Sequence, residues 1–468
     1  MKGGVPMRCE ITLRPVWHAD AVASMDVKYA FDALEIGAGE ELCRFQLRTV
    51  SIPGCEPENL RAADAAGDVP LSAADSAPYP YELRHFTAQR AVSGAVKVEY
   101  TVRPRVLEPE AICGPYFDLR AEEGGANSAG ISFLAAFEGC AGDISLRWDM
   151  SEMPEGSIGV CPFGEGDVSY TGALDTLRNS YFAFGRVKCL TEGEFGFYWL
   201  TEPYFDMPGI AAYTRSLFAV MQRFFSDTDP TYRIFVRKDP FLTSGGTALH
   251  RSYMFGWNDH QPVSVEAKQT LLAHEMVHNW PRLNDAPYGR TTWYAEGTAE
   301  FYSLMLPLRA GLMTPAAALR ELQQRTDNYY TNPTRHMENE AAAKICWQDR
   351  RAQRIAYGRG FIFLGNVDVM MRRATGGRRS IDDVVLRVLE IDRAGGELGN
   401  ELFLSLVKEY SGLDVTAEWE AMRTGEHIVP MEDSFDGLFT VREKTIPEAD
   451  TGAMVTSYEW SLRNKGDA

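Results

Sequence analysis

The period of the hydrophobic pattern changes near Pro208, and this change restricts the folds that the chain can adopt. Before about residue 105, apolar and polar residues alternate with a period of two, as in CEITLRP, MDVKYAF and AVKVEYTVRP, with Gly, Pro, Asp and Asn clusters between them. Short strands separated by turns predict a β-sandwich. From Ile210 on, segments such as IAAYTRSLFAVMQRFF space apolar residues as a helix does. The order along the chain is therefore β, then α+β, then α, which predicts an α+β multidomain protein.

The length of 468 residues exceeds what one hydrophobic core supports, so several domains are expected. The composition shifts predict a β-rich N-terminal domain, a mixed domain, a helical domain and a polar, weakly patterned C-terminal tail with room for a strand. Their ranges are 1–204, 205–330, 331–430 and 431–468. Within the first part, the segment EEGGANSAG (122–130) is expected to be a loop.

Helix capping signals stand out in the second half of the chain. Thr314 precedes a proline, which is typical of an N-cap followed by the first helical position. Ser380 has an acidic residue, Asp383, three positions later, as in a capping box. The apolar pattern of NELFLSLVKEYSG ends at Gly412, a typical helix stop. The sequence therefore predicts that helices begin after Thr314 and Ser380 and that one helix ends at Gly412.

Charge and composition exclude several classes of function. The formal net charge of -18 disfavours nucleic-acid partners and anionic membranes, since both need a basic surface. No apolar run is long enough to cross a membrane. The start, MKGGVPMRCEITL, has no apolar signal region, so a cytoplasmic location is expected. The eight cysteines are scattered and form no Cys-x-x-Cys pair, which is typical of reduced thiols.

The segment LLAHEMVHNW (271–280) carries the clearest chemical signal. His274 and His278 are four residues apart, so on a helix both imidazoles lie on one face and can bind one metal ion. Glu275 lies to the side of that pair, where a carboxylate can act as a general base. The alternative for the pair alone is one core histidine and one surface histidine. Zinc prefers about four ligands, so a third protein ligand and a water are expected.

The third ligand is expected from WYAEGTAEFY (293–302), which also has the pattern of a helix. Glu296 is the best candidate, since the loop PRLNDAPYGR allows the chain to return to the histidines. Glu300, one turn later, either holds the free ring nitrogen of a ligand histidine or is a solvated helix residue. These residues predict a zinc site that activates water for hydrolysis.

The same segments resemble the glycyl aminopeptidase family of zinc peptidases, gluzincins related to aminopeptidase N. The resemblance rests on HEMVHNW, WYAEGTAEFYSLMLPLRAGLMT, AYGRGFIFLGNVDVMMRRATGGRRSIDDVVLRVL (356–389) and FLSLVKEYSGLDVTAEWEAMRTGEHIVP (403–430). It implies a thermolysin-like catalytic domain with one catalytic Zn²⁺, bound by His274, His278 and Glu296. It also implies that Glu275 is the general base.

The resemblance implies two further groups of site residues. Tyr357 matches a tyrosine whose hydroxyl stabilises the oxyanion; its alternative is a packed helix tyrosine. Gly245 and Gly246, in SGGTALHRSYMFGW, match an edge strand that binds the substrate backbone. Relatives have a lysine where this chain has Arg359, and many end in a PDZ domain, for which the tail here is too short.

The largest departure concerns the substrate amine. The edge strand of aminopeptidases carries a glutamate that takes the free N-terminus, and this segment has none. The sequence Met337-Glu338-Asn339 looks like the missing motif but follows the zinc ligands, so it is interpreted as a coincidence. The expected function is a zinc metallopeptidase acting on peptides or proteins, with aminopeptidase action favoured. The alternatives are a zinc endopeptidase, a non-catalytic peptide-binding protein, and a zinc hydrolase of non-peptide amides or epoxides.

Overall fold

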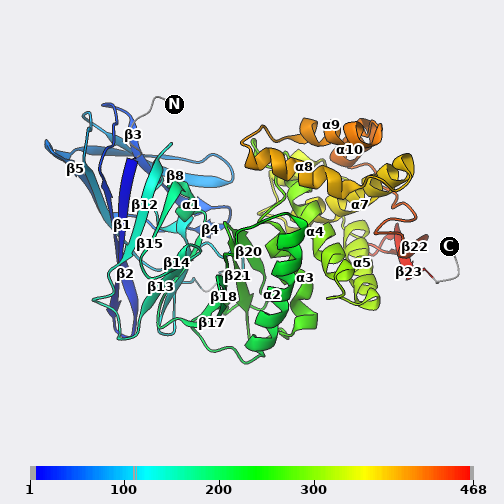
Figure 1. The fold of residues 1–468 in the computed structure, drawn as a ribbon, viewed down its shortest axis with the longest axis horizontal. Coiled ribbons are helices and arrows are strands. Elements are labelled where there is room, and N and C mark those ends of the chain that lie inside the picture. Colours follow the sequence, from blue (N-terminus) through cyan, green and yellow to red (C-terminus); the bar gives the residue numbers. More distant parts are fainter. Residues whose placement is uncertain (1–6, 109–110, 112, 464–468) are drawn as a thin grey trace. The chain divides into compact units, whose positions relative to one another are not determined.

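The protein forms two compact units, seen here in a computed structural model that describes residues 7–108, 111 and 113–463 (Figure 1). The first unit comprises Met1–Ala212 and Asp229–Ala267, and the second Tyr213–Thr228 and Lys268–Ala468. The predicted fold class is confirmed: the first part of the chain is rich in strands and the last part is helical. The finer boundaries at residues 204, 330 and 430 stay predictions.

The N-terminal strands of the first unit build two sheets around one core. A seven-stranded sheet has the order β15-β12-β1-β2-β9-β5-β6, and a four-stranded sheet the order β4-β3-β8-β7. One cluster of buried side chains takes residues from both, such as Ile11, Val27 and Val98 from the first and Phe45 from the second. The shared core makes this part a β-sandwich, as predicted. The bounds are β1 Met7–His18, β2 Ala21–Phe31, β3 Glu41–Thr49, β4 Ile52–Pro53, β5 Glu58–Asp64, β6 Gly67–Val69, β7 Leu71–Ser76, β8 Tyr81–Ala88, β9 Val96–Val102, β12 Ala141–Trp148 and β15 Val168–Ala173.

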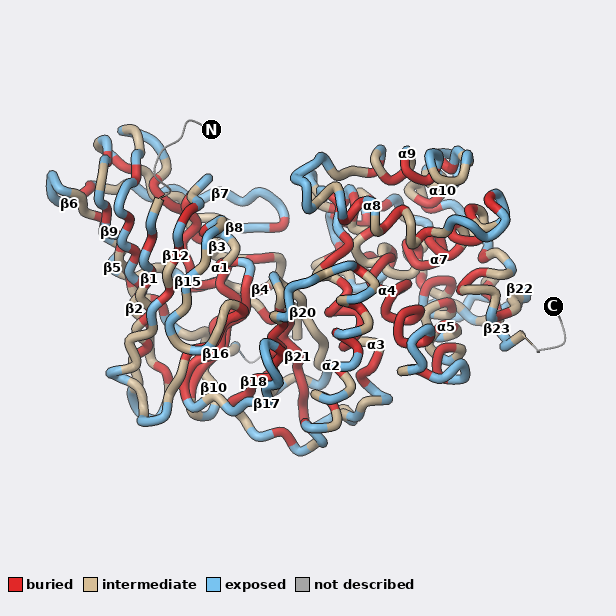
Figure 2. The backbone as a smooth tube through the Cα atoms, in the orientation of Figure 1, coloured by how far each residue is buried: buried red, intermediate tan, exposed pale blue. Residues whose placement is uncertain are grey.

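Two five-stranded sheets complete the first unit. Their orders are β10-β11-β16-β13-β14 and β17-β18-β19-β21-β20, and they share a smaller core that includes Tyr181, Phe235 and Met254. Strands such as β16 and β18 are buried along their whole length (Figure 2). The bounds are β10 Arg120–Glu122, β11 Gly125–Ala129, β13 Ile158–Cys161, β14 Gly164–Glu165, β16 Tyr181–Gly185, β17 Lys188–Glu192, β18 Phe195–Trp199, β19 Tyr232–Lys238, β20 Gly246–Leu249 and β21 Ser252–Trp257; the short α1 spans Asp175–Arg178.

The loop predicted at 122–130 is wrong, because most of it is the buried strand β11 of an antiparallel β10–β11 pair. Every residue of β11 is buried, so no alternation of polar and apolar residues appears in its sequence. Small residues are required there: a Cβ on Gly125 would lie 2.1 Å from the carbonyl oxygen of Phe184 on the neighbouring strand.

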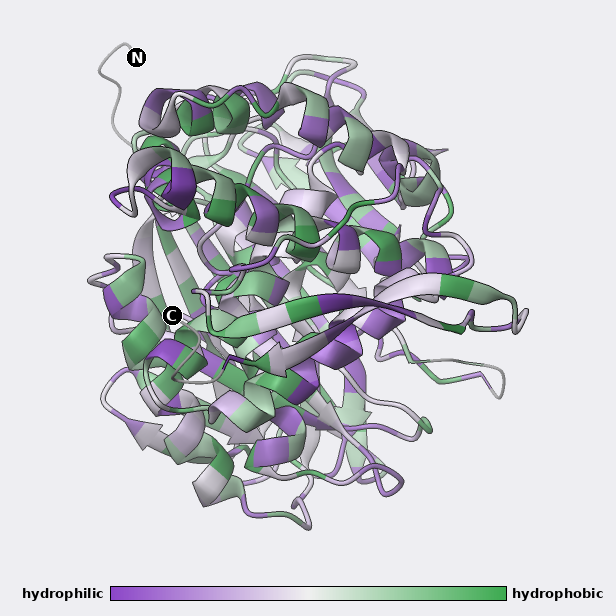
Figure 3. Cartoon of the chain, turned by 90° about the vertical axis from the view of Figure 1, so that its right-hand side faces the viewer, coloured by the Kyte–Doolittle hydropathy of each residue, from purple (hydrophilic) through white to green (hydrophobic). Residues whose placement is uncertain are grey.

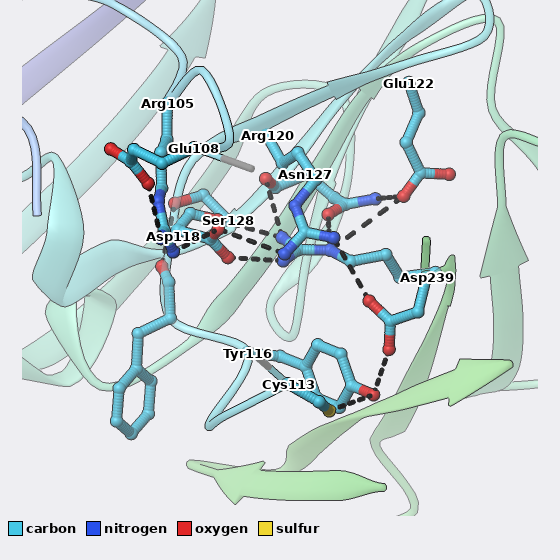
Figure 4. A network of polar contacts seen from close by, with 12 residues as sticks. Arg105, Glu108, Cys113, Tyr116, Asp118, Arg120, Glu122, Asn127, Ser128 and Asp239 are labelled. Carbon is cyan, nitrogen blue, oxygen red and sulfur yellow. Dashed lines mark hydrogen bonds and ion pairs between the residues drawn. The ribbon is translucent and has the colours of Figure 1, made fainter. Parts of the chain in front are cut away.

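A network of buried charges lies between these two sheets of the first unit (Figure 4). Arg237 is fully buried and donates to Asp118 (2.6 Å). Arg120 donates to Asp118 and to Asp239, at 3.1 Å each. The hydroxyl of Tyr116 donates to the other oxygen of Asp239. Buried charges are tolerated when each has a partner, and these residues satisfy one another.

The second unit is mainly helical, and hydrophobic and hydrophilic residues are interspersed along each of its visible helices (Figure 3). The capping predictions are confirmed: the Thr314 hydroxyl accepts from the Ala317 amide (3.2 Å), a capping box joins Ser380 and Asp383, and a helix ends before Gly412 in the left-handed conformation (φ +75°). The bounds are α2 Met207–Phe224, α3 Val265–Val277, α4 Thr292–Arg309, α5 Pro315–Tyr330, α6 Asn339–Ala343, α7 Arg350–Thr375, α8 Ile381–Arg393, α9 Asn400–Ser411 and α10 Thr416–Thr424, where α2 and α3 begin in the first unit.

The C-terminal segment forms an antiparallel hairpin of β22 (Phe439–Pro447) and β23 (Met454–Leu462). The indole of Trp460 donates to the hydroxyl of Thr326 on α5 (2.9 Å). The backbone amide of Trp460 donates to the side chain of Gln323 (2.9 Å). The hairpin is therefore fastened to a helix of the same unit. Among the described residues, no helix combines the length and the apolar character that crossing a bilayer requires.

Candidate metal centre

Helix α3 places the two histidines on one face, at its C-terminal end. His274 lies in the last turn, and His278 follows the last helical residue, where the turn continues through hydrogen bonds from Asn279 and Trp280 back to Met276 and Val277. The indole of Trp280 also donates to Asp227 (2.8 Å), which anchors the end of the turn. The four-residue spacing therefore brings both imidazoles to one point, as predicted.

Helix α4 supplies the acidic residue that completes the cluster. Its N-terminus is held by Asp285, whose carboxylate accepts from the amides of Thr291 (2.5 Å) and Gly289 (3.0 Å). The negative charge of Asp285 also interacts favourably with the positive end of the helix dipole. Glu296 and Glu300 follow one turn apart on the same helix. Both face His274, at 3.3 Å from its Nε2 and Nδ1 atoms respectively.

The three predicted ligand atoms lie at the spacing that a zinc ion requires. The Nε2 atoms of His274 and His278 are 3.1 Å apart, and Glu296 Oε2 is 3.3 Å from the first and 3.6 Å from the second. In a tetrahedron with zinc–ligand bonds near 2.05 Å, ligand atoms are separated by about 3.3 Å. Glu296 Oε2 is buried and, within the part of the chain that the structure describes, has no hydrogen-bond partner. The donor set and its spacing fit zinc.

Glu300 contacts the outer ring nitrogen of His274, and its predicted role of orienting a ligand histidine stays a prediction. Its Oε1 lies 3.3 Å from His274 Nδ1, and its Oε2 lies 2.6 Å from Nε of Arg325. A carboxylate on the outer nitrogen fixes the tautomer of a metal-binding histidine and leaves Nε2 free for the metal. Glu300 is not a solvated helix residue.

The electrostatics of the cluster favour a positive charge between its members. Burial alone would lower the pKa of His274, but its interactions with the carboxylates of Glu296 and Glu300 outweigh it and raise that pKa to about 10. Burial lowers the pKa of His278 to about 4, so this imidazole stays neutral near neutral pH. Burial raises the pKa of Glu300, but Arg325 and His274 outweigh it and lower the pKa to about 2. The carboxylates thus attract a cation, and a bound metal ion would supply one.

Glu275 and Tyr357 lie beside the cluster without adding a ligand to it. Glu275 is buried, and burial raises its pKa to about 7. The ring of Tyr357 stacks on the ring of His274, with centroids 5.6 Å apart and planes 3° from parallel. Arg354, one turn earlier on α7, lies 4.9 Å above the Tyr357 ring. The cluster therefore has a buried carboxyl group and a phenol next to its ligands.

Tyr357 reaches this position because α7 crosses α4 at two glycines. A Cβ on Gly297 of α4 would lie 2.7 Å from the Cα of Gly360 on α7. A Cβ on Gly360 would lie 2.1 Å from the carbonyl oxygen of Trp293. No other residue type allows the two backbones to approach so closely. The crossing thereby brings Tyr357 next to Glu296.

Gly245 and Gly246 belong to the first unit. Gly246 opens β20, which among the described strands pairs with β21 alone and is therefore an edge strand of its sheet. The amide of Gly245 donates to the hydroxyl of Tyr116 (3.0 Å), which ties this segment to the buried network. The edge position of β20 matches the predicted edge strand. The predicted binding of a substrate backbone by this strand stays a prediction.

Three contributing residues were not predicted from the sequence. Asp285 holds the loop that leads into α4, Arg325 holds Glu300, and Arg354 covers Tyr357. Arg354 is three residues before Tyr357, so helical spacing offers a weak signal for it. Arg325 lies 25 residues after Glu300 and on another helix, and no sequence pattern indicates that contact.

Comparisons with known proteins agree with this geometry. The family model described as M61 glycyl aminopeptidase matches residues 267–356, about a fifth of the chain, so the predicted resemblance is confirmed for that segment. The segment contains His274, His278, Glu296 and Glu300 and ends just before Tyr357. No curated protein matches the sequence.

Solved structures share the fold over nearly the whole chain. An aminopeptidase N family protein from Idiomarina loihiensis is 14% identical with a TM-score of 0.71, covering 95% of this chain and 81% of that one. An M1 zinc metallopeptidase from Deinococcus radiodurans, a variant bound to a Tyr-Ser-Ala substrate, is 14% identical with a TM-score of 0.57, covering 91% and 95%. Yeast LTA4 hydrolase is 12% identical with a TM-score of 0.59, covering 93% and 70%. The chain has the fold of multidomain zinc metallopeptidases.

Proposed function

We propose that the protein is a zinc-dependent peptidase that removes residues from the N-terminus of peptides. The observation that carries the proposal is the cluster of His274, His278 and Glu296, whose spacing fits zinc and which lies beside a buried carboxyl group and a phenol. The family match and the shared fold support peptide hydrolysis. A site that only stabilised the fold would have no use for Glu275 and Tyr357.

The chain's own residues then have distinct roles. Zinc, when bound, would activate a water molecule and polarise the scissile carbonyl. Glu275 accepts a proton from the attacking water and returns it to the leaving amine. The hydroxyl of Tyr357 donates a hydrogen bond to the oxyanion of the tetrahedral intermediate. Glu300 holds His274 in the tautomer that binds the metal. The edge strand that begins at Gly246 pairs with the substrate backbone.

Aminopeptidase action rests on the family match, because the residue that would hold the substrate amine is not identified. Glu338, in the Met-Glu-Asn sequence, is exposed and precedes α6. The second candidate function is therefore endopeptidase action, which the absence of a glutamate from SGGTALHRSYMFGW favours.

The test is a digest of a mixed peptide library, with both new ends read by mass spectrometry and the zinc content of the protein measured. Loss of single N-terminal residues is the expected result. Internal cuts would replace aminopeptidase by endopeptidase action. No cleavage by zinc-loaded protein would contradict peptidase function and favour a peptide-binding protein or a non-peptide substrate.

A further inference from the structure

Arg354 is an exposed arginine beside the candidate metal centre, within the second unit. It lies near the start of α7, three residues before Tyr357. Its guanidinium carbon is 4.9 Å from the centroid of the Tyr357 ring, and that ring stacks on His274. Burial is the largest influence on the pKa of Glu275, and the positive charges of His274 and Arg354 oppose it. A positive charge therefore lies next to the proposed oxyanion donor and the proposed general base.

The guanidinium of Arg354 has donors left for a ligand. Among the residues that the structure describes, it takes part in no hydrogen bond or ion pair. Arg351, three residues earlier, is already engaged, since it donates to Asp349 (2.9 Å) and Asp450 (3.0 Å). A guanidinium presents a planar fork of N–H groups that matches the two oxygens of a carboxylate. The contact with the Tyr357 ring restrains the Arg354 side chain without occupying those donors.

The charges around the centre favour an anionic ligand once zinc is bound. Three carboxylates and two guanidinium groups lie at or next to the proposed metal ligands, namely those of Glu275, Glu296, Glu300, Arg325 and Arg354. A zinc ion adds two positive charges, so these groups together carry one positive charge in excess. Arg325 is paired with Glu300 (2.6 Å). Of these five side chains, Arg354 is therefore the cation that can bind a further anion.

We infer that Arg354 binds a carboxylate of the substrate that lies within one residue of the scissile bond. The inference rests on the proposed peptidase function, which places the scissile carbonyl beside the hydroxyl of Tyr357. Successive Cα atoms of a peptide are about 3.8 Å apart, so a carboxylate one residue away lies within reach of a side chain that covers the Tyr357 ring. The preferred substrates are then dipeptides, through their C-terminal carboxylate, or peptides with an acidic residue at the cut.

The test compares four short substrates that differ in the carboxylate they carry. Ala-Ala amide is the neutral reference. Ala-Ala with a free C-terminus, Ala-Glu amide and Glu-Ala amide place a carboxylate at the chain end, after the cut and before the cut, respectively. At least one of the three should be cleaved at least about fivefold faster than the reference, in kcat/KM, because a bidentate pair is stronger than an ordinary exposed ion pair. The substrate that responds identifies the source of the carboxylate.

Variants of Arg354 connect this preference to its guanidinium. Arg354→Gln should reduce the ratio of the preferred substrate to the reference to about one. Arg354→Lys should keep part of the ratio, since an ammonium group retains the charge but not the planar fork. Arg320→Gln, at an exposed arginine on α5 of the same unit, is the matched control and should keep the wild-type ratio.

Three results would overturn the inference while peptidase function stands. The first is a wild-type protein that cleaves none of the carboxylate substrates faster than the reference. The second is a preference that survives in Arg354→Gln. The third is an equal loss of rate for all four substrates in Arg354→Gln, which would assign Arg354 to the support of Tyr357 instead.

Binding measurements separate this inference from the proposed function if none of the four substrates is cleaved. The same peptides are then titrated by calorimetry into zinc-loaded Glu275→Gln protein, with and without Arg354→Gln. Tighter binding of a carboxylate peptide than of Ala-Ala amide, lost when Arg354 is replaced, would support the inference although aminopeptidase action fails. Equal or undetectable binding would reject both.

Discussion

At the scale of single residues, the proposed function gives Glu275 a different role from that of the two histidines on its helix: it moves a proton and does not bind the metal. Replacing it with Gln keeps the shape of the side chain but removes its basicity. Turnover should fall by at least about 10², the low end of the effect of general-base catalysis. Zinc content should stay unchanged, since His274, His278 and Glu296 are intact. Steady-state kinetics and metal analysis of the purified variant measure both.

Glu266→Gln provides the control, since Glu266 is an exposed carboxylate in the first turn of the same helix. It should leave turnover as in the wild type. A Glu275→Gln protein that retained wild-type rates would remove Glu275 from the mechanism.

Single residues also show where sequence reasoning succeeds and where it ends. His274 and His278 were predictable because helical spacing alone places them on one face. Tyr357 could be chosen among many tyrosines only by family resemblance. Arg359 was noticed only as a substitution for lysine. Its actual role, binding Asn339 and the carbonyl of Met337, depends on contacts some twenty residues away along the chain.

At the scale of elements, the crossing of α4 and α7 sets the distance between the candidate metal centre and the phenol of Tyr357. Gly360→Ala would place a Cβ 2.1 Å from the carbonyl oxygen of Trp293, so the helices must separate. The protein should lose about 1–3 kcal/mol of stability through overpacking. The turnover of the remaining folded protein should fall, because Tyr357 moves away from Glu296. Thermal unfolding and kcat measured below the transition test this.

Gly365→Ala is the matched control on the same helix. There a new Cβ would meet the ring of Phe435 at 3.1 Å, and a ring can shift more easily than a backbone. Alanine also favours a helix over glycine. The effect on stability and on kcat should be much smaller than for Gly360→Ala, and equal effects would contradict the role of the crossing.

Elements were predictable where periodicity and caps agree, and not where burial removes the periodicity. The helix starts at Thr314 and Ser380 follow from local hydrogen bonds, which are encoded by neighbouring residues. Strand β11 is buried on both faces, so its composition resembles that of a loop. The contact between Gly297 and Gly360 was equally hidden, since a glycine in a helix does not indicate which backbone it meets.

At the scale of the whole molecule, the first unit depends on buried ion pairs that respond to pH. Burial alone would raise the pKa of Asp118, but the charges of Arg237 and Arg120 outweigh burial and lower that pKa to about 2. The ordinary value is 3.8, so Asp118 contributes about 2 kcal/mol of stability above pH 4. This contribution is lost as the pH falls from about 4 toward 2. Asp118→Asn should therefore destabilise the protein near neutral pH, and the difference from wild type should shrink with acidification.

Urea unfolding of both proteins at several pH values from about 3 to 7 measures this difference. Asp68→Asn, at an exposed carboxylate of the same unit, should change stability little at any of them. A wild-type advantage over Asp118→Asn that stayed constant down to about pH 3 would show that the ionisation of Asp118 does not support the fold.

The candidate metal centre concerns the second unit alone, because α3 contributes its ligands from that unit and α4 lies wholly within it. Zinc bound to the folded state should stabilise this unit by about 4 kcal/mol when free zinc exceeds Kd a thousandfold. A chelator should therefore lower the unfolding temperature of one transition, and restoring zinc should raise it again. Limited proteolysis after chelation should cut first within Lys268–Ala468.

Glu296→Ala is the control, since it removes a proposed ligand and should make unfolding nearly insensitive to the chelator. Equal sensitivity of wild type and Glu296→Ala would mean that the stabilising metal binds elsewhere.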